Sequence, residues 1–263
     1  MSQTKDFPQP NTDARVKLIL TLAMIFALGF TPHGSWPAYV LFFSLVISAA
    51  VYFQLRVMMV LRRALVALPF ILAALPLIFA GPPPIQQLPL AGGWSLPFSP
   101  AGAERFVSIA LKSYISVQAA IILTAVTPTP DLLRALHHLR VPRTLVVILS
   151  LMAHYLVILK EEALRLLHAR QSRSSRLPMP TPRPPGGSLW WRGQVTGGMA
   201  GNLLLRSLER SERVYAAMCA RGYNGKPPFT QAAPLSAAQR GVIILGIAAN
   251  LLILLTGILI GES

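Results

Sequence analysis

The chain has 263 residues, of which 53% are hydrophobic and only 13% charged, and its formal net charge is +15. This hydrophobic share exceeds that of an ordinary soluble domain and predicts an all-α polytopic membrane protein, so the positive charge indicates cytoplasmic loops and not a nucleic-acid site. The single cysteine, Cys219, excludes an intramolecular disulfide and a Cys-x-x-Cys redox pair.

Five apolar runs are predicted to cross the membrane. They occupy residues 16–30, 38–53, 64–80, 106–126 and 241–260. A membrane helix needs about 20 residues, so the first two runs must take in flanking residues to span the bilayer. Pro69 and Pro76 predict a kink in the third run.

Lys112 is the basic residue that lies well inside the fourth run. We expect it on a polar face toward neighbouring helices, or with its ammonium group reaching outward to the interface. Contact with a partner subunit is the alternative role for this lysine.

The charges flanking the runs predict their orientation. Arg15 and Lys17 precede the first run, whereas residues 81–103, which connect the third and fourth runs, carry no charge. Because basic residues accumulate on the cytoplasmic side, the N-terminus is predicted to be cytoplasmic.

A sixth apolar stretch, residues 144–159, is followed by Lys160, Glu161 and Glu162. A full crossing would send these charges outside, so we expect the stretch to lie on the cytoplasmic side. The expected total is five crossings with the C-terminus outside, and six is the alternative.

The uneven distribution of basic residues divides the chain into three regions. Fifteen of the 24 lie between residues 134 and 226. We therefore expect N-terminal membrane helices in residues 1–130, cytoplasmic coupling helices in residues 131–238 and a C-terminal membrane helix in residues 239–263. Five prolines and two glycines in residues 177–187 predict a break between two cytoplasmic helices.

The first of these helices is predicted over residues 160–174, with Glu161 and Arg165 as an i,i+4 ion pair. The second is predicted over about residues 203–221, with Glu209 and Arg213 in the same relation. Gly222 suits the left-handed position that ends such a helix.

Arg170 and Arg221 stand near the ends of these two helices. Val214 and Met218 share a helix face with Arg221, so this arginine is expected at the rim of an apolar strip. Its planar five-donor group suits insertion between acidic or carbonyl groups of a partner protein. From the residues alone, the alternative is that both arginines only favour their own helix ends or touch lipid headgroups.

The Ala-Arg elements at residues 169–171 and 220–222 resemble those of the transmembrane T component of energy-coupling-factor (ECF) transporters. Asp13-Ala-Arg-Val-Lys17 is similar to that family's opening signature. Residues 127–136 with Leu139-Arg-Val-Pro142 are similar to its mid-chain signature. These motifs occur in the expected order over most of the chain and resemble the cobalt and nickel branch most closely.

This resemblance implies a scaffold subunit in a prokaryotic cytoplasmic membrane. Its implied partners are two ATP-hydrolysing subunits and a separate substrate-binding membrane subunit, the S component. The residues that it implies for ATPase docking are Ala169, Arg170, Gln171, Ala220, Arg221 and Gly222, and those that support the coupling helix are Glu209, Arg213 and Met218. The implied cargo is cobalt or nickel, with a vitamin as the alternative.

Gln171 departs from the family, which often has glycine at this position. The end of the first coupling helix is therefore less sharply placed than that of the second.

The sequence contains no Gly-x-x-x-x-Gly-Lys-Ser/Thr segment, so we expect ATP to be used by partner subunits and no cofactor to be bound by this chain. The five histidines form no metal-ligand pattern, and the acidic residues form no catalytic cluster. The chain is thus expected to be non-catalytic. An independent permease and a polytopic membrane enzyme are the more remote alternatives.

Overall fold

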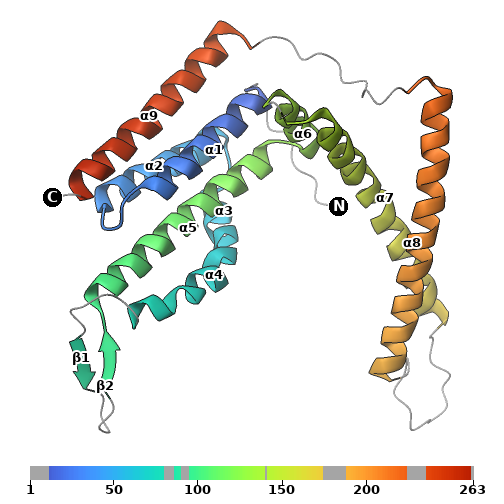
Figure 1. The fold of residues 1–263 in the computed structure, drawn as a ribbon, viewed down its shortest axis with the longest axis horizontal. Helices are drawn as coiled ribbons and strands as arrows, with labels where there is room; N and C mark the ends of the chain where they lie inside the picture. The colour runs from blue at the N-terminus through green and yellow to red at the C-terminus, as the bar shows by residue number, and fades with distance from the viewer. Residues whose placement is uncertain are drawn as a thin grey trace. The chain divides into compact units, whose positions relative to one another are not determined.

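The computed structural model describes residues 12–79, 86–89, 95–139, 141–173, 188–223 and 235–261. The chain forms two compact units (Figure 1). One unit contains Met1–Ala135 and Ala232–Ser263, and the other contains Leu136–Gln231. The predicted break at residues 177–187 lies outside the described residues.

Four long helices build the first unit: α1 (Ala14–Phe30), α2 (Trp36–Tyr52), α5 (Pro100–Val126) and α9 (Ala237–Gly261). Asp13 caps α1 by accepting a hydrogen bond from the amide of Arg15 at 3.2 Å. Both α1 and α2 pack against α5 and α9 (Figure 1). Four of the five predicted apolar runs are therefore continuous helices, each extended by a few residues beyond its apolar part.

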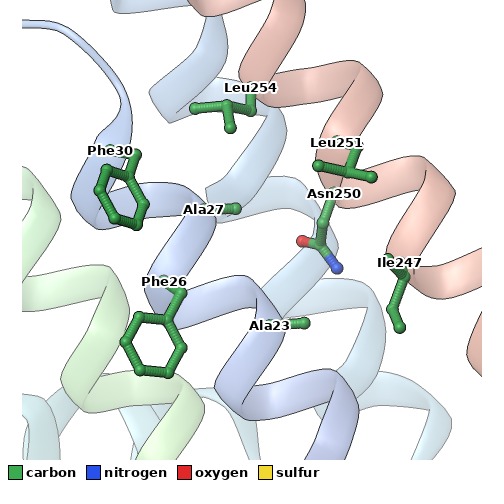
Figure 2. A pocket seen from close by; sticks show the side chains of 8 residues that line it. All are labelled: Ala23, Phe26, Ala27, Phe30, Ile247, Asn250, Leu251 and Leu254. Carbon is green, nitrogen blue, oxygen red and sulfur yellow. The ribbon is translucent and has the colours of Figure 1, made fainter.

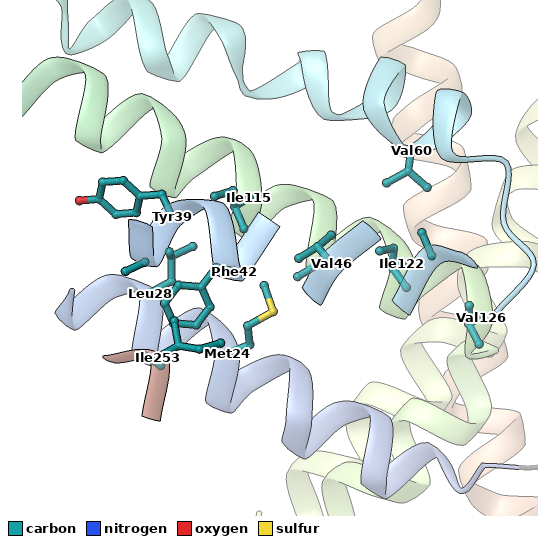
Figure 3. Close-up of a cluster of buried hydrophobic side chains, with 14 residues drawn as sticks. Met24, Leu28, Tyr39, Phe42, Val46, Val60, Ile115, Ile122, Val126 and Ile253 are labelled. Atoms are coloured by element: carbon teal, nitrogen blue, oxygen red, sulfur yellow. The ribbon is translucent and has the colours of Figure 1, made fainter. Parts of the chain in front are cut away.

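The core of this unit is apolar and formed by side chains from several helices. Figure 3 shows Leu28, Phe42 and Ile115 pointing toward one another from α1, α2 and α5. Each of these three side chains is at most 1% exposed. Many outward-facing apolar side chains are exposed, including Phe30 at 76% and Leu245 at 76%. This pattern fits a surface that faces lipid and not water.

The third apolar run is not a single helix. It consists of α3 (Val57–Ala64), η1 (Leu65–Ala67), α4 (Leu68–Ala73) and η2 (Leu75–Ile78). A proline stands in the first turn of α4 and of η2, where its missing N–H and fixed φ start a new segment. The kink predicted from Pro69 and Pro76 is confirmed, but as a series of breaks.

A short antiparallel hairpin follows, formed by β1 (Gln86–Pro89) and β2 (Ser95–Phe98), with Gln86 opposite Phe98. The sequence did not predict it, because its four-residue strands contain prolines and lie in a stretch that reads as a loop. The other regular elements among the described residues are helices.

Lys112 points into the first unit. Its ammonium group donates to the carbonyl of Thr31, at the C-terminal end of α1. In the same connection, Ser35 donates to the carbonyl of Gly257 at 2.7 Å, and the Gly34 amide donates to Ser108 Oγ at 3.2 Å. The prediction of a polar face toward neighbouring helices is confirmed, since Lys112 satisfies a helix-end carbonyl.

The second unit contains two long helices, α7 (Arg143–Arg173) and α8 (Leu189–Ala220). The short helix α6 (Thr129–His138) precedes them. The apolar stretch 144–159 and the charged stretch 160–174 were predicted as separate segments, but α7 joins them in one helix of 31 residues. No residue between them disfavours a helix, so it continues.

By length and composition, three described helices could cross a membrane: Pro100–Val126, Thr144–Ser172 and Ala237–Ile260. The helix α2 is apolar but shorter. The segment Thr144–Ser172 is the one that the sequence placed on the cytoplasmic side. That location, and the choice between five and six crossings, stay predictions.

Candidate functional site

The C-terminal end of α8 is fixed by its backbone. Arg221 is the last residue of the helix turn, and Gly222 follows with a φ of 82°. The amide of Tyr223 donates to the carbonyl of Met218 at 3.0 Å, and the amide of Gly222 donates to that of Cys219 at 2.9 Å. These two bonds form a Schellman motif. The predicted role of Gly222 is confirmed.

This cap holds Arg221 at an exposed, sharply ended terminus. Ala220, Arg221 and Gly222 are all exposed. A Cβ placed on Gly222 would meet no atom within 4 Å, so the position selects glycine for its backbone conformation and not for lack of space. The Arg221 guanidinium can therefore be presented to a partner without rearrangement of the helix end.

The residues predicted to support the coupling helix, Glu209, Arg213 and Met218, differ in how much they contribute to the structure at the end of α8. Glu209 and Arg213 form the predicted ion pair at 3.9 Å, but their side chains are 68% and 71% exposed. An exposed pair of this kind contributes little to stability. Met218 contributes more directly, because its carbonyl accepts from both Arg221 and Tyr223. Val214 and Met218 are half-buried, in accord with the predicted strip.

Tyr215 lies one turn before the end of α8 and is 61% exposed. Its hydrogen bond with Cys219 raises the pKa of the Tyr215 hydroxyl. A tyrosine is neutral at physiological pH already at its ordinary pKa of about 10, so Tyr215 adds no charge near Arg221.

The Arg170 end of the helix pair is built differently. Arg170 lies within the last turn of α7, which continues to Arg173, so the helix end is not at the Ala-Arg element itself. Ala169 and Gln171 are exposed and Arg170 is half-buried. Its Nη1 donates to Thr196 Oγ1 at 2.9 Å, and its guanidinium carbon lies 5.9 Å from the centre of the Trp191 ring.

The sequence did not indicate a role for Trp191 or Thr196 beside Arg170. Both lie in the part of α8 that precedes the predicted start at residue 203. Four glycines, at positions 193, 197, 198 and 201, made this stretch a poor helix candidate. Ser188 nevertheless starts the helix there, since its Oγ accepts from the amide of Trp191 at 3.3 Å.

An ion pair joins α7 and α8 further along. Arg206 Nη1 lies 2.9 Å from Glu162 Oε1, and Arg165 lies 3.8 Å from the same carboxylate. The predicted pair of Glu161 with Arg165 is wrong. Glu162 takes the place of Glu161 because it is less exposed, with 22% of its side chain accessible, and lies within reach of Arg206 on the neighbouring helix.

The two helices are antiparallel, since Glu162 meets Arg206 while Arg170, later in α7, meets Thr196, earlier in α8. Arg221 follows Thr196 in α8 by 25 residues. At a rise of 1.5 Å per residue, these positions are about 37 Å apart along the helix. The structure thus places the two arginines at opposite ends of the α7–α8 pair.

The first unit holds a groove between α1 and α9, with a volume of 180 Å³. Figure 2 shows the Asn250 carboxamide directed from α9 toward α1, where the small side chains of Ala23 and Ala27 leave room. The other side chains that line the groove are apolar: Phe26, Phe30, Ile247, Leu251 and Leu254. Among the described residues, no three His, Cys, Asp or Glu side chains gather in a way that could hold a metal ion.

Comparison with known proteins gives two matches. The family model for CbiQ, described as cobalt transport protein, matches residues 6–231, a span that includes both arginine elements. The nickel permease LarQ of Lactiplantibacillus plantarum is 31% identical over 125 residues. That alignment covers 48% of this chain and 42% of LarQ, which is less than half of each protein.

Proposed function

The chain belongs to the CbiQ cobalt transport protein family, and we propose that it is the non-catalytic scaffold subunit of an ATP-driven ECF transporter for cobalt or nickel. Its implied partners are two ATP-binding subunits and a substrate-binding S component. ATP is bound and hydrolysed by the ATPase subunits. This chain transmits their movement to the membrane.

The observation that carries this proposal is the pair of arginine-bearing ends on α7 and α8. Two ATPase subunits require two separate docking points, and Arg170 and Arg221 lie at opposite ends of one helix pair. The residues at each end are suited to docking: Ala169, Gln171, Ala220 and Gly222 are small or polar and exposed. Each guanidinium can then enter an acidic groove on one ATPase subunit.

Transmission needs helices that move as one piece. The Arg206–Glu162 ion pair and the Arg170–Thr196 hydrogen bond join α7 to α8 at two points, 2.9 Å long in both cases. When ATP binding draws the two ATPase subunits together, a helix pair joined in this way shifts or rotates as a unit. That movement reaches the substrate-binding subunit through the membrane helices.

We further propose that the α7–α8 pair lies on the cytoplasmic side of the membrane. The protein is then a multi-pass component of the prokaryotic cytoplasmic membrane with a cytoplasmic N-terminus. The density of basic residues in this part of the chain supports the assignment.

Charge reversal at both arginines tests the proposal. We expect Arg170→Glu combined with Arg221→Glu to abolish co-purification of the ATPase subunits, because each substitution presents a carboxylate to an acidic groove. The amount of the variant in the membrane fraction should equal that of the wild type.

A matched control reverses one basic residue on each helix that lies outside these contacts. Lys160→Glu with Arg210→Glu changes the net charge equally, at an exposed side chain of α7 and a half-buried one of α8. This control should retain the ATPase subunits. Equal loss in both double variants would show a general charge effect and contradict specific docking.

The cargo is tested by purifying the intact complex from native membranes and measuring bound metal and vitamin together. Stoichiometric cobalt or nickel is the expected result. A bound vitamin with no metal would move the protein to the vitamin-type branch without affecting the docking proposal.

A further inference from the structure

The first turns of α8 lie beside Arg170 and expose an unusual amount of apolar surface. Leu189 is 85% exposed and Trp190 is 83% exposed. The next residue, Trp191, lies under the Arg170 guanidinium. A cation and a large apolar surface therefore adjoin at one end of the helix pair.

We propose that the first turns of α8 form the second half of the Arg170 docking surface, so that one ATPase subunit contacts both helices. In this surface Trp191 and Thr196 position the guanidinium, while Leu189 and Trp190 contact the apolar rim of the groove that receives it. This inference rests on the proposed function and adds residues that the Ala-Arg element does not include.

Thr196 is suited to positioning because its hydroxyl has two partners. It donates to the carbonyl of Arg192 at 2.7 Å, which directs its lone pairs away from the helix backbone. Arg170 Nη1 donates to the same oxygen at 2.9 Å. One N–H of the guanidinium is thus fixed by a hydroxyl that the backbone itself orients.

The ring of Trp191 limits the movement of the Arg170 guanidinium on one of its faces. The distance of 5.9 Å from the guanidinium carbon to the ring centre is within the range of a cation–π contact. The Ser188 cap fixes the first turn of α8, which carries Trp191. A side chain held at two points loses less conformational entropy when it binds, so docking is stronger than for a free arginine.

Leu189 and Trp190 indicate the kind of partner. Tryptophan and arginine together are typical of residues that contribute most to protein interfaces, where an apolar ring excludes water from a charged contact. An acidic groove with an apolar rim on the ATPase subunit complements both parts of this surface. A lipid headgroup layer is the competing partner for an exposed tryptophan, and the experiment below separates the two.

The test uses the full chain in lipid nanodiscs and the ATPase subunits that co-purify with the wild type, purified separately. We expect Trp190→Ala to raise the dissociation constant about 30-fold, as for a central interface tryptophan. Leu205→Ala removes a side chain that is 60% exposed elsewhere on α8 and should change the constant less than about twofold.

The positioning role is tested by a double-mutant cycle. Thr196→Val should weaken binding about fivefold, and Thr196→Ser should restore it. In an Arg170→Ala background, Thr196→Val should have no further effect, because there is no guanidinium left to position. An equal loss in both backgrounds would overturn the positioning role, since it would show that Thr196 acts only through the fold.

Three further outcomes overturn the inference. If Arg170→Ala weakens binding but Trp190→Ala does not, the docking proposal stands and the composite surface is wrong. If brominated lipids quench the fluorescence of the assembled complex less after Trp190→Phe, Trp190 contacts lipid and not the ATPase. If neither Arg170→Ala nor Trp190→Ala weakens binding, both the inference and the proposed function fail.

Discussion

The two ends of the α7–α8 pair present an arginine in different ways. At the end of α8, backbone hydrogen bonds and the left-handed Gly222 stop the helix directly after Arg221. At the other end, α7 continues past Arg170, and side chains from a second helix hold the guanidinium. The position of an arginine can therefore be set by one short segment of chain or by the packing of two distant ones.

This difference has a consequence for assembly. The Arg221 end requires only that α8 be folded to its last turn. The Arg170 end requires α7 and α8 to be paired in the correct register. Changes that loosen the helix pair should therefore affect the Arg170 contact first, and changes to the cap should affect the Arg221 contact first.

The largest effect is expected from a substitution in the C-terminal cap of α8, which should change the Arg221 end and leave the Arg170 end unchanged. Gly222→Val places a β-branched residue at a φ of 82°, which costs about 1–2 kcal/mol or more, so the last turn of α8 should fray. Hydrogen exchange of residues 214–223 should become faster, while exchange around Arg170 stays unchanged. Gly222→Asn is the control, because asparagine tolerates the left-handed conformation.

If Gly222→Val accelerates exchange equally at both ends, the two ends of the helix pair are not independent of one another, contrary to this expectation.

A smaller effect is expected from the ion pair that joins the helices. Glu162→Gln weakens the contact with Arg206, whose side chain is 62% exposed, by about 0.5–1 kcal/mol after allowance for solvent screening. The distance distribution between spin labels on α7 and α8 should broaden. Glu161→Gln, one residue earlier and exposed, is the matched control and should leave the distribution unchanged.

An unchanged distribution in the Glu162→Gln variant would show that apolar contacts alone set the helix register, so that the Arg170 end does not depend on this ion pair.

The smallest effect is expected at Glu209. Its pair with Arg213 is exposed on both sides, so Glu209→Gln should lower helix stability by about 0.3 kcal/mol and change ATPase binding less than twofold. Thermal unfolding and binding assays check this. A loss of binding comparable to that of Arg221→Glu would assign Glu209 a direct contact with the partner.

The Arg221 end could be predicted from the sequence because everything that forms it is local. The run of helix formers, Met218 and Gly222 lie within a few residues of one another, and a Schellman motif needs no distant contact. The Arg170 end could not be predicted to the same extent. Its partner Thr196 is 26 residues away, and the register of two antiparallel helices depends on packing that no short motif specifies.

In the fold, too, the features that depend on distant contacts could not be predicted from the sequence. Apolar runs predicted the long membrane helices, and Pro69 and Pro76 predicted where the third run is broken. Because of its glycines, the first part of α8, about 14 residues, was not predicted as helix. Pairing with α7 and the Ser188 cap stabilise the helix there. The choice of Glu162 over Glu161 as the partner of Arg165 likewise depends on the neighbouring helix, because Glu162 also meets Arg206.

Site-directed cross-linking tests the central claim most directly, since Cys219 is the single cysteine of the chain. In a Cys219→Ser background, Arg170→Cys and Arg221→Cys are each treated in the assembled complex with a short thiol-to-carboxylate cross-linker. Each variant should cross-link to an ATP-binding subunit, and Arg213→Cys should not. An intact complex in which neither position 170 nor position 221 cross-links to an ATP-binding subunit would contradict the proposed docking.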